Sequence, residues 1–369
     1  MTILQPRDGP IDGQHYLEST ATSVRWGRLP CRGADPVLTV RPGEVVTIDT
    51  VSHEGILEDF GRDPVGWFGR HGVARESVLR DAVAIAAEVP RRSDAGPHVV
   101  TGPIAIEGAE PGDVLRLDVV GLRLRVPYGV ISNRHGYGAL AGEYPEGPPP
   151  DPDADASRPE GFRTVSVFTE VEPRGGRFFG SMTFGAGRVV RYPLAPFLGI
   201  MGVAPDTDGE PSSTPPGPHG GNLDIAALQV GTRVYLPVEV PGALVYVGDP
   251  HFAQGNGEVC LTALEGSLRA DLRFTVLRGR EARRAVGLIR RPFGETDEHW
   301  IPVGLHEDLD EALREAVRHA IDFLAARFEM ERHLAYAYLS AAADFEISQV
   351  VDGVKGVHCL IRKQDFGET

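Results

Sequence analysis

The sequence predicts a mostly β fold that ends in a pair of helices. Glycine (45 residues) and proline (30 residues) are abundant in the 369-residue chain, and both favour short strands joined by turns. A Pro-Gly turn followed by an acidic residue separates two apolar strands twice, within 37–51 and within 99–120. Towards the C-terminus, apolar residues recur at helical spacing instead.

Runs of apolar and β-branched residues between turn residues locate the strands. We expect strands at 37–40, 45–51, 99–106, 114–120, 163–171, 233–240, 243–247, 257–264 and 272–277, and a last one over 354–361. Between the early strands, apolar residues at helical spacing predict one helix over 75–89.

The two C-terminal helices are predicted from an apolar stripe and a start signal. Apolar residues from Leu309 to Leu324 lie on one face of a helix, and Asp308 with Glu311 forms a capping box at its start. A second helix is expected over 331–342.

Two segments rich in proline and polar residues, at 146–158 and 206–218, are expected to be surface loops because they cannot bury a core. We therefore predict three parts that form one interwoven unit. They are an N-terminal β-rich part (1–145) with a helical insertion at about 56–97, a central β-rich part (146–280) and a C-terminal α/β part (281–369).

Charge and cysteine content restrict the partners and the compartment. The formal net charge of −15 argues against nucleic acid or an anionic membrane as a partner. The three cysteines are widely spaced and predict no disulfide framework, which favours a reducing, cytoplasmic location. No secretory leader and no apolar run long enough to span a membrane are apparent.

The densest group of chemically capable residues lies in two glycine-rich segments, 218–224 (PHGGNLD) and 248–258 (GDPHFAQGNGE). Asp249 and His251 are two residues apart at a strand end, so their side chains should lie on the same side. They would then bind a divalent metal or form a hydrogen-bonded base pair, and Glu258 would carry a proton to a leaving nitrogen. The glycines would let backbone N–H groups approach an oxyanion.

Each of these residues taken alone also has a purely structural interpretation. Asp and Asn beside Gly are ordinary turn residues, and Asp249-Pro250 is a common turn start. His219 follows a proline and is explained equally well by a hydrogen bond to the backbone. The spacing matches no standard metal motif such as HExxH.

The two segments belong to longer stretches, 216–224 and 236–267, that resemble the signature block of the acetamidase/formamidase family almost residue for residue. The stretches 37–55, 101–115, 196–205 and 339–352 fit the same family, so the resemblance spans most of the chain. It implies a mostly β fold with jelly-roll or barrel-like sub-domains and a smaller α/β portion. It also implies hydrolysis of a short amide such as formamide or acetamide, and a homo-oligomer.

The resemblance also implies roles for individual residues, including Asp113 and Glu107 of one Pro-Gly turn. The expected catalytic residues are Glu107, Asp224, Asp249, His251 and Glu258, and the expected substrate-binding residues are His219, Asn222 and Phe252. A divalent metal, Zn²⁺ or Ca²⁺, is expected at Asp249 and His251, joined by His53 and His98 if their strand ends meet the signature block. No organic cofactor is expected.

Other amidase chemistries lack their residues here. The two lysines, Lys355 and Lys363, lie near the C-terminus away from any nucleophile loop, Cys260 lies in an apolar run, and no GxSxG motif is present. The alternative from another class is a non-catalytic small-molecule-binding protein with a structural Ca²⁺ site. Against it, calcium prefers oxygen ligands, and His219 and His251 lie in the same group of residues.

Overall fold

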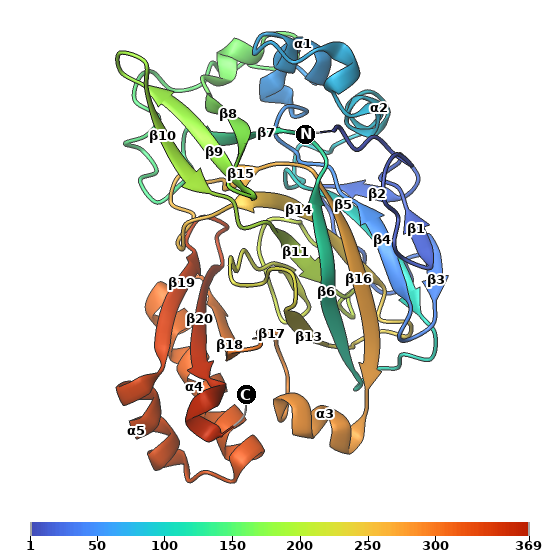
Figure 1. Ribbon diagram of the computed structural model, residues 1–369, viewed down its shortest axis with the longest axis vertical. Coiled ribbons are helices and arrows are strands. Elements are labelled where there is room, and N and C mark those ends of the chain that lie inside the picture. The colour runs from blue at the N-terminus through green and yellow to red at the C-terminus, as the bar shows by residue number, and fades with distance from the viewer. Residues whose placement is uncertain (1, 368–369) are drawn as a thin grey trace.

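The computed structural model describes residues 2–367, which form two large β-sheets with helices at both ends of the molecule (Figure 1). In order across the first sheet lie β1 (His15–Leu17), β4 (Val45–Asp49), β16 (Leu268–Leu277), β6 (Val114–Leu124), β13 (Arg233–Pro237), β17 (Phe293–Glu295), β18 (His299–His306), β20 (Lys355–Arg362) and β19 (Asp344–Gln349).

The second sheet branches. Its main path is β10 (Arg188–Pro193), β9 (Arg177–Phe184), β8 (Val165–Arg174), β7 (Tyr128–Asn133), β15 (Leu264–Glu265), β14 (Val245–Ala253), β11 (Phe197–Gly202) and β12 (Gly220–Asn222). From β14 it branches to β5 (Val99–Ile106), which also pairs with β2 (Val24–Trp26) and β3 (Leu38–Val40).

The helices lie at opposite ends of the molecule (Figure 1). The helices α1 (Pro64–Gly69) and α2 (Arg80–Glu88), with η1 (Glu58–Phe60) and η2 (Arg75–Ser77), lie at the top. At the other end, α4 (Leu309–Phe328) packs on β18 and β20 and against α5 (Arg332–Ala342), and α3 (Gly279–Val286) follows β16. Two short 3₁₀ helices, η3 (Pro159–Phe162) and η4 (Lys363–Phe366), complete the elements.

The mostly β fold with a C-terminal helical pair is confirmed. The strand expected over 99–106 has the bounds of β5, and the helix expected over 75–89 is α2 preceded by η2. The predicted start of α4 is also present, because the Asp308 side chain accepts a hydrogen bond of 3.0 Å from the Glu311 N–H. No helix in the part of the chain that the structure describes is both long and apolar enough to cross a membrane.

The strand expected over 257–264 is wrong. Only Leu264 of this run joins a strand, β15, and the preceding residues form a loop. Glu258 (φ 48°) and Leu261 (φ 112°) have positive φ angles, which interrupt an extended strand. The loop lies against the site described below instead of continuing the sheet.

Strand pairing joins the three predicted parts of the chain. Strand β5 of the first part pairs with β14 of the second, and β13 of the second pairs with β17 of the third. The boundaries near 145 and 280 stay a prediction.

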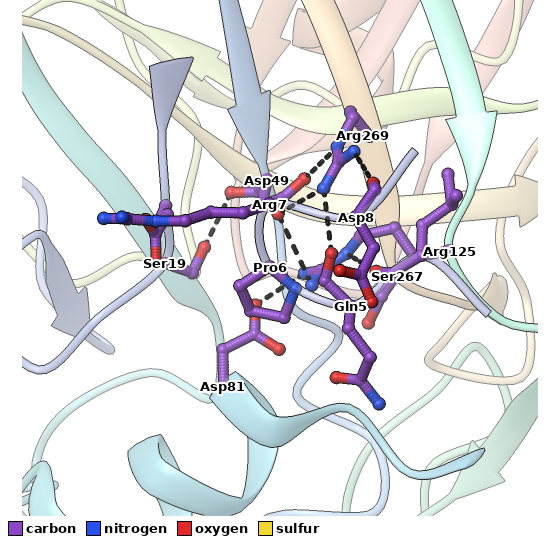
Figure 2. A network of polar contacts seen from close by, with 12 residues as sticks. Gln5, Pro6, Arg7, Asp8, Ser19, Asp49, Asp81, Arg125, Ser267 and Arg269 are labelled. Atoms are coloured by element: carbon purple, nitrogen blue, oxygen red, sulfur yellow. Dashed lines mark hydrogen bonds and ion pairs between the residues drawn. The ribbon is translucent and has the colours of Figure 1, made fainter. Parts of the chain in front are cut away.

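Two buried arginines fasten the N-terminal segment to the first sheet, as Figure 2 shows. Arg269 on β16 donates to both carboxylate oxygens of Asp49 on β4, at 2.6 and 3.0 Å, and to the carbonyl of Gln5 at 3.2 Å. Arg125, which follows β6, donates to Asp81 of α2 at 2.7 Å. Arg125 also donates to the carbonyl of Leu4 at 3.0 Å. Because both guanidinium groups are buried, such hydrogen bonds replace the lost water and fix the N-terminal segment on the sheet.

Candidate active site

Eight buried His, Asp and Glu side chains converge where the ends of several strands meet. We call them the buried cluster: His53, His98, Asp224, Asp249, His251, Glu258, Glu265 and Asp352. They come from segments as far apart as the residues after β4, the residues before β5, strand β14 and the turn after β19. Buried charged groups are rare unless they are paired or bind a metal, so this gathering is unusual for a purely structural core.

Strand β14 supplies the centre of the cluster. Asp249 has a positive φ angle of 50°, and it occupies a position where β14 makes no regular pair with β11. The Asp249 and His251 side chains lie on the same side, with Asp249 Oδ2 at 3.1 Å from His251 Nε2. The predicted approach of these two residues is therefore present in the structure.

Three acidic members of the cluster have left-handed backbone conformations. The φ angles are 47° at Asp224, 50° at Asp249 and 48° at Glu258. Such conformations cost free energy for a residue with a Cβ and are concentrated at functional sites. Here they turn three carboxylates from different segments towards one another.

A glycine allows the carboxylates to approach the backbone of β11. A Cβ atom at Gly199 would lie 2.4 Å from Asp224 Oδ1 and 2.6 Å from Asp249 Oδ2. Both separations are far below van der Waals contact, so no other residue fits at this position without moving the carboxylates.

The cluster contains four overlapping groups with the composition and spacing of metal sites. They are His53–His98–Asp249, Asp224–Asp249–His251, His251–Glu258–Glu265 and Asp224–Glu258–Asp352. In the first, Asp249 Oδ1 lies 3.4 Å from His53 Nδ1 and 3.8 Å from His98 Nε2. Ligands of a four-coordinate zinc ion at about 2.0–2.1 Å lie roughly 3.4 Å apart, so the spacing fits.

Many polar atoms of the cluster have no hydrogen-bond partner among residues 2–367. These atoms are His53 Nδ1, Asp249 Oδ1, Glu265 Oε2, Asp352 Oδ2, both ring nitrogens of His251 and both carboxylate oxygens of Asp224. Buried polar atoms are nearly always satisfied in proteins, so this many orphaned atoms in one place require an explanation such as a bound ion. A divalent cation contacted by these atoms would satisfy them.

The surroundings shift the pKa values of the acidic members of the cluster in different directions. Burial, together with the charge of Asp249, raises the pKa of Asp224 to about 7, and burial raises the pKa of Glu258 well above its usual range. Burial opposes ionisation of Asp249 too, but His251 and His98 outweigh it and hold the pKa of Asp249 well below its usual range. Asp249 is therefore the permanent carboxylate, and Glu258 is a carboxyl group that can hold a proton.

The pKa values of the two histidines in the group His53–His98–Asp249 are also shifted in opposite directions. Burial alone would lower the pKa of His53, but its contacts with Asp249 and Glu54 raise it to about 10. Burial lowers the pKa of His98 to about 4, so its imidazole is neutral and is free to act as a ligand. His98 Nδ1 lies 3.0 Å from Ser213 Oγ, which orients the ring.

The cluster is open to a cavity of about 360 Å³. Its wall includes six members of the cluster, His53, His98, Asp249, Glu258, Glu265 and Asp352, together with Asn222. The rest of the wall comes from residues 57–59, 91 and 95–97, the loop after β7, η3 and the loop before β15, with Thr164, Thr214 and Val351. A small molecule in this cavity can therefore reach carboxylates and imidazoles at once.

The structure brings most of the predicted site residues together. Asp224, Asp249, His251, Glu258, His53 and His98 are members of the cluster, and Asn222 is buried and lines the cavity. His219 is half-buried in the turn before β12 and does not line the cavity. Phe252 is fully buried in the hydrophobic core, on the face of β14 opposite to His251, and also does not line it.

The structure does not bring the Pro-Gly turn residues to the cluster. The side chain of Glu107 is 54% exposed and lies 3.6 Å from Arg41. Asp113 pairs with Arg278 at 3.1 Å and accepts a hydrogen bond from the Glu110 N–H. Both carboxylates are explained by local turn and surface contacts.

Three residues of the site were not predicted from the sequence. Glu265 lies 2.9 Å from His251 Nε2, Asp352 belongs to the all-carboxylate group, and Glu54 lies 3.2 Å from His53 Nε2. Each precedes a glycine (Gly266, Gly353 and Gly55), as acidic turn residues often do. That pattern was available, but it does not separate a ligand from an ordinary turn.

Comparisons with known proteins point to one family. The model of the Acetamidase/Formamidase family matches residues 209–361. A formamidase of Methylophilus methylotrophus is 28% identical over 202 residues, which cover 44% of this chain and 47% of that protein. An acetamidase of Mycolicibacterium smegmatis is 28% identical over 223 residues, which cover 49% of this chain and 54% of that protein.

The chain spans about half the length of these curated relatives, but a solved structure matches it throughout. The crystal structure of an acetamidase from Bacillus halodurans superposes with a TM-score of 0.70 at 25% identity, covering 95% of this chain and 98% of that one. The family model, the curated relatives and the fold thus all point to the Acetamidase/Formamidase family.

Proposed function

We propose that this chain hydrolyses the carbon–nitrogen bond of a linear amide of the formamide and acetamide class, releasing a carboxylate and ammonia. The observation that carries the proposal is the buried cluster of three histidines and five carboxyl groups, six of whose members line a cavity. Amide hydrolysis needs an activated water, a polarised carbonyl and a proton for the leaving nitrogen, and this set of groups provides for all three. The names of the relatives, formamidase and acetamidase, support the same reaction.

The residues fit a divalent metal, as their orphaned buried atoms indicate. We propose that His53, His98 and Asp249 hold it beside the cavity, with the cation displacing the proton of His53 and with Asp249 shared with the group that contains His251. A bound zinc ion supplies Lewis acidity towards a carbonyl and lowers the pKa of water. The group Asp224–Glu258–Asp352 offers only oxygen atoms and suits a hard cation such as Ca²⁺ better.

Other side chains of the site have separate roles in the proposed reaction. Asn222 contributes a side-chain oxygen that has no hydrogen-bond partner among the described residues, and it lines the cavity. As an acceptor, it can take a hydrogen bond from the –NH₂ of a primary amide and orient it. Glu258, whose pKa is raised by burial, is placed to hold a proton and donate it to the departing nitrogen.

Glu54 and Arg134 keep His53 in position. The carboxylate of Glu54 lies 3.2 Å from His53 Nε2 and 2.7 Å from Arg134 Nη2, and it accepts a hydrogen bond from Ser132. Such a contact to the far nitrogen fixes the ring orientation and leaves Nδ1 directed at Asp249.

Ammonia release from formamide and acetamide, before and after chelation and after adding Zn²⁺ or Ca²⁺, tests the proposal. Activity that is lost on chelation and restored by one metal supports it, and activity indifferent to chelation moves the chemistry to the carboxylates and imidazoles alone. Release of no ammonia from any amide under any metal condition would favour a non-catalytic binding protein with structural Ca²⁺.

A matched pair of variants locates the chemistry. Asp249→Asn should lower kcat/KM at least about 100-fold, the scale of losing a catalytic proton-transfer or electrostatic group. Glu107→Gln, the same change of an exposed carboxylate at the far end of β5, should leave kcat/KM within twofold of wild type. Equal losses in the two variants would contradict the site assignment.

A further inference from the structure

The size and lining of the cavity define the substrate more closely. From them we infer that this site takes a primary amide whose acyl group is neutral and considerably larger than that of acetamide. The inference rests on the proposed amide hydrolysis and adds the class of substrate to it.

The volume of the cavity is the first argument. At about 360 Å³ it lies within the range of roughly 300–1,000 Å³ that pockets for drug-sized ligands have. Since one molecule of liquid water occupies about 30 Å³, the cavity has room for roughly a dozen non-hydrogen atoms. Formamide or acetamide would fill only a small part of it and would leave most of the wall in contact with water.

The charge of the wall is the second argument. Its two arginines are already neutralised, because Arg91 pairs with Glu58 at 2.6 Å and Arg134 pairs with Asp59 at 2.7 Å. Arg91 also donates to the carbonyls of Ala95 and Gly96 at 2.9 and 3.2 Å.

The remaining charged groups of the wall make a negative acyl group unfavourable. Asp249, Glu258, Glu265 and Asp352 add carboxyl groups and no further arginine or lysine balances them. A negatively charged acyl group would therefore meet the carboxylate of Asp249 and no unpaired arginine or lysine, and it would be repelled. For a positively charged acyl group, Glu58 and Asp59 are already engaged, and its charge would lose water against the apolar part of the wall.

The apolar part of the wall is the third argument. It is contributed by separate segments and consists of Leu57, Pro97, Tyr137, Pro150, Phe162, Leu261 and Val351. Removing apolar surface of a substrate from water against such side chains lowers the free energy of the complex in proportion to the area buried. An aliphatic or aromatic acyl group matches this surface.

One segment builds much of this side of the cavity. Residues 56–97, which the sequence analysis predicts to be a helical insertion, supply Leu57, Glu58, Asp59, Arg91 and Pro97 to the wall. The ion pair between Glu58 and Arg91 joins the two ends of that segment. The segment therefore contributes to the size of the cavity and supplies three of the charged groups that face it, Glu58, Asp59 and Arg91.

A substrate series tests the inference on the full-length protein loaded with the metal that gives activity. Ammonia release is measured with formamide, acetamide, butanamide, hexanamide and phenylacetamide, and with succinamate as a negatively charged amide. We expect kcat/KM to rise roughly fourfold for each added methylene group that becomes buried, and succinamate to be at least about tenfold poorer than butanamide.

The outcomes separate this inference from the proposed function. Activity that is highest on formamide or acetamide and falls with chain length would overturn the inference and leave amide hydrolysis standing. A preference for succinamate would overturn the neutral acyl group. Release of no ammonia from any of the amides would refute amide hydrolysis itself, and the inference with it.

A pair of Phe→Ala variants tests the apolar wall directly. Phe162 lines the cavity from η3, whereas Phe178 on β9 is exposed and does not line it. Phe162→Ala should lower kcat/KM at least about fivefold for hexanamide and phenylacetamide while acetamide stays within twofold, and Phe178→Ala should change none of them. An equal loss of Phe162→Ala on acetamide would contradict a role of this ring in holding the acyl group.

Discussion

Replacing Gly199 by alanine should disable the site while leaving the fold intact. The added Cβ would lie 2.4 Å from Asp224 Oδ1, 2.6 Å from Asp249 Oδ2 and 2.8 Å from His251 Cε1. Because ordinary contacts to a methyl group begin near 3.4 Å, the two carboxylates must each retreat by about 1 Å. The Gly199 backbone does not have a positive φ angle, so alanine is compatible with its conformation and only the methyl group acts.

The size of the effect follows from this displacement. A shift of about 1 Å in a catalytic group costs on the order of 100-fold in rate, and displaced ligands typically lower metal affinity 10- to 100-fold. Overpacking at a buried position should cost about 1–3 kcal/mol of unfolding free energy. Activity is measured as ammonia release, metal content by elemental analysis of the purified protein, and stability by urea denaturation.

Gly209→Ala is the matched control, because a Cβ at Gly209 meets nothing within 4 Å and its φ angle is not positive. This variant should equal wild type in all three measurements. If Gly199→Ala kept both full activity and full metal content, the carboxylates of Asp224 and Asp249 would have to be dispensable, and the proposed site would be refuted.

Two stability predictions concern residues away from the site. Arg269→Met should lower the unfolding free energy, measured in urea, by about 3–5 kcal/mol, because Asp49 would remain buried without its partner. The same change at exposed Arg273 should cost less than about 0.5 kcal/mol. Equal losses in the two variants would contradict the role of the buried pair. Burial lowers the pKa of His319 from 6.5 to about 4, so the unfolded chain binds more protons and this residue makes stability fall by about 2 kcal/mol between pH 7 and pH 5. The stability difference between wild type and His319→Asn should shrink by that amount over the same interval in urea titrations, and a constant difference would show that His319 does not titrate on unfolding.

Local patterns in the sequence predict the parts of the fold that local physics decides. Strand β5 is a run of apolar residues between turns, and α4 begins at a side-chain cap that the sequence displays. The shared side of Asp249 and His251 follows from the alternation of a strand. In each case the relevant interactions join residues that are close in the sequence.

The strand wrongly predicted at 257–264 shows the limit of predictions from local patterns. Its apolar residues suit a strand, but Glu258 and Leu261 have positive φ angles in the structure. The segment is held by tertiary contacts, such as the hydrogen bond of 3.0 Å from the Gly257 N–H to the Ser348 carbonyl. A local pattern of residues cannot predict a hydrogen-bond partner that lies 91 residues away, counted from 257 to 348.

Glu107 and His98 illustrate the same limit for site residues. Both flank β5, and both are polar residues next to an apolar run. The eight residues of β5 span about 26 Å at 3.3 Å each, so its two ends lie far apart along the strand direction. Only the pairing of β5 with β14, which runs antiparallel, shows that the end at His98 is the one that meets the cluster.

The cluster itself depends on long-range topology. His53 follows β4, a strand of the first sheet, whereas Asp249 and His251 lie on β14 of the second, so the site exists only when both sheets are assembled. Asp352 adds a carboxylate from the turn after β19, at the far edge of the first sheet. Since each of these groups is costly to bury alone, the cluster opposes folding until the opposite charges meet, or until a cation binds. The large apolar core, which lies outside the cluster and contains residues of both sheets, is therefore what keeps the two sheets together around it.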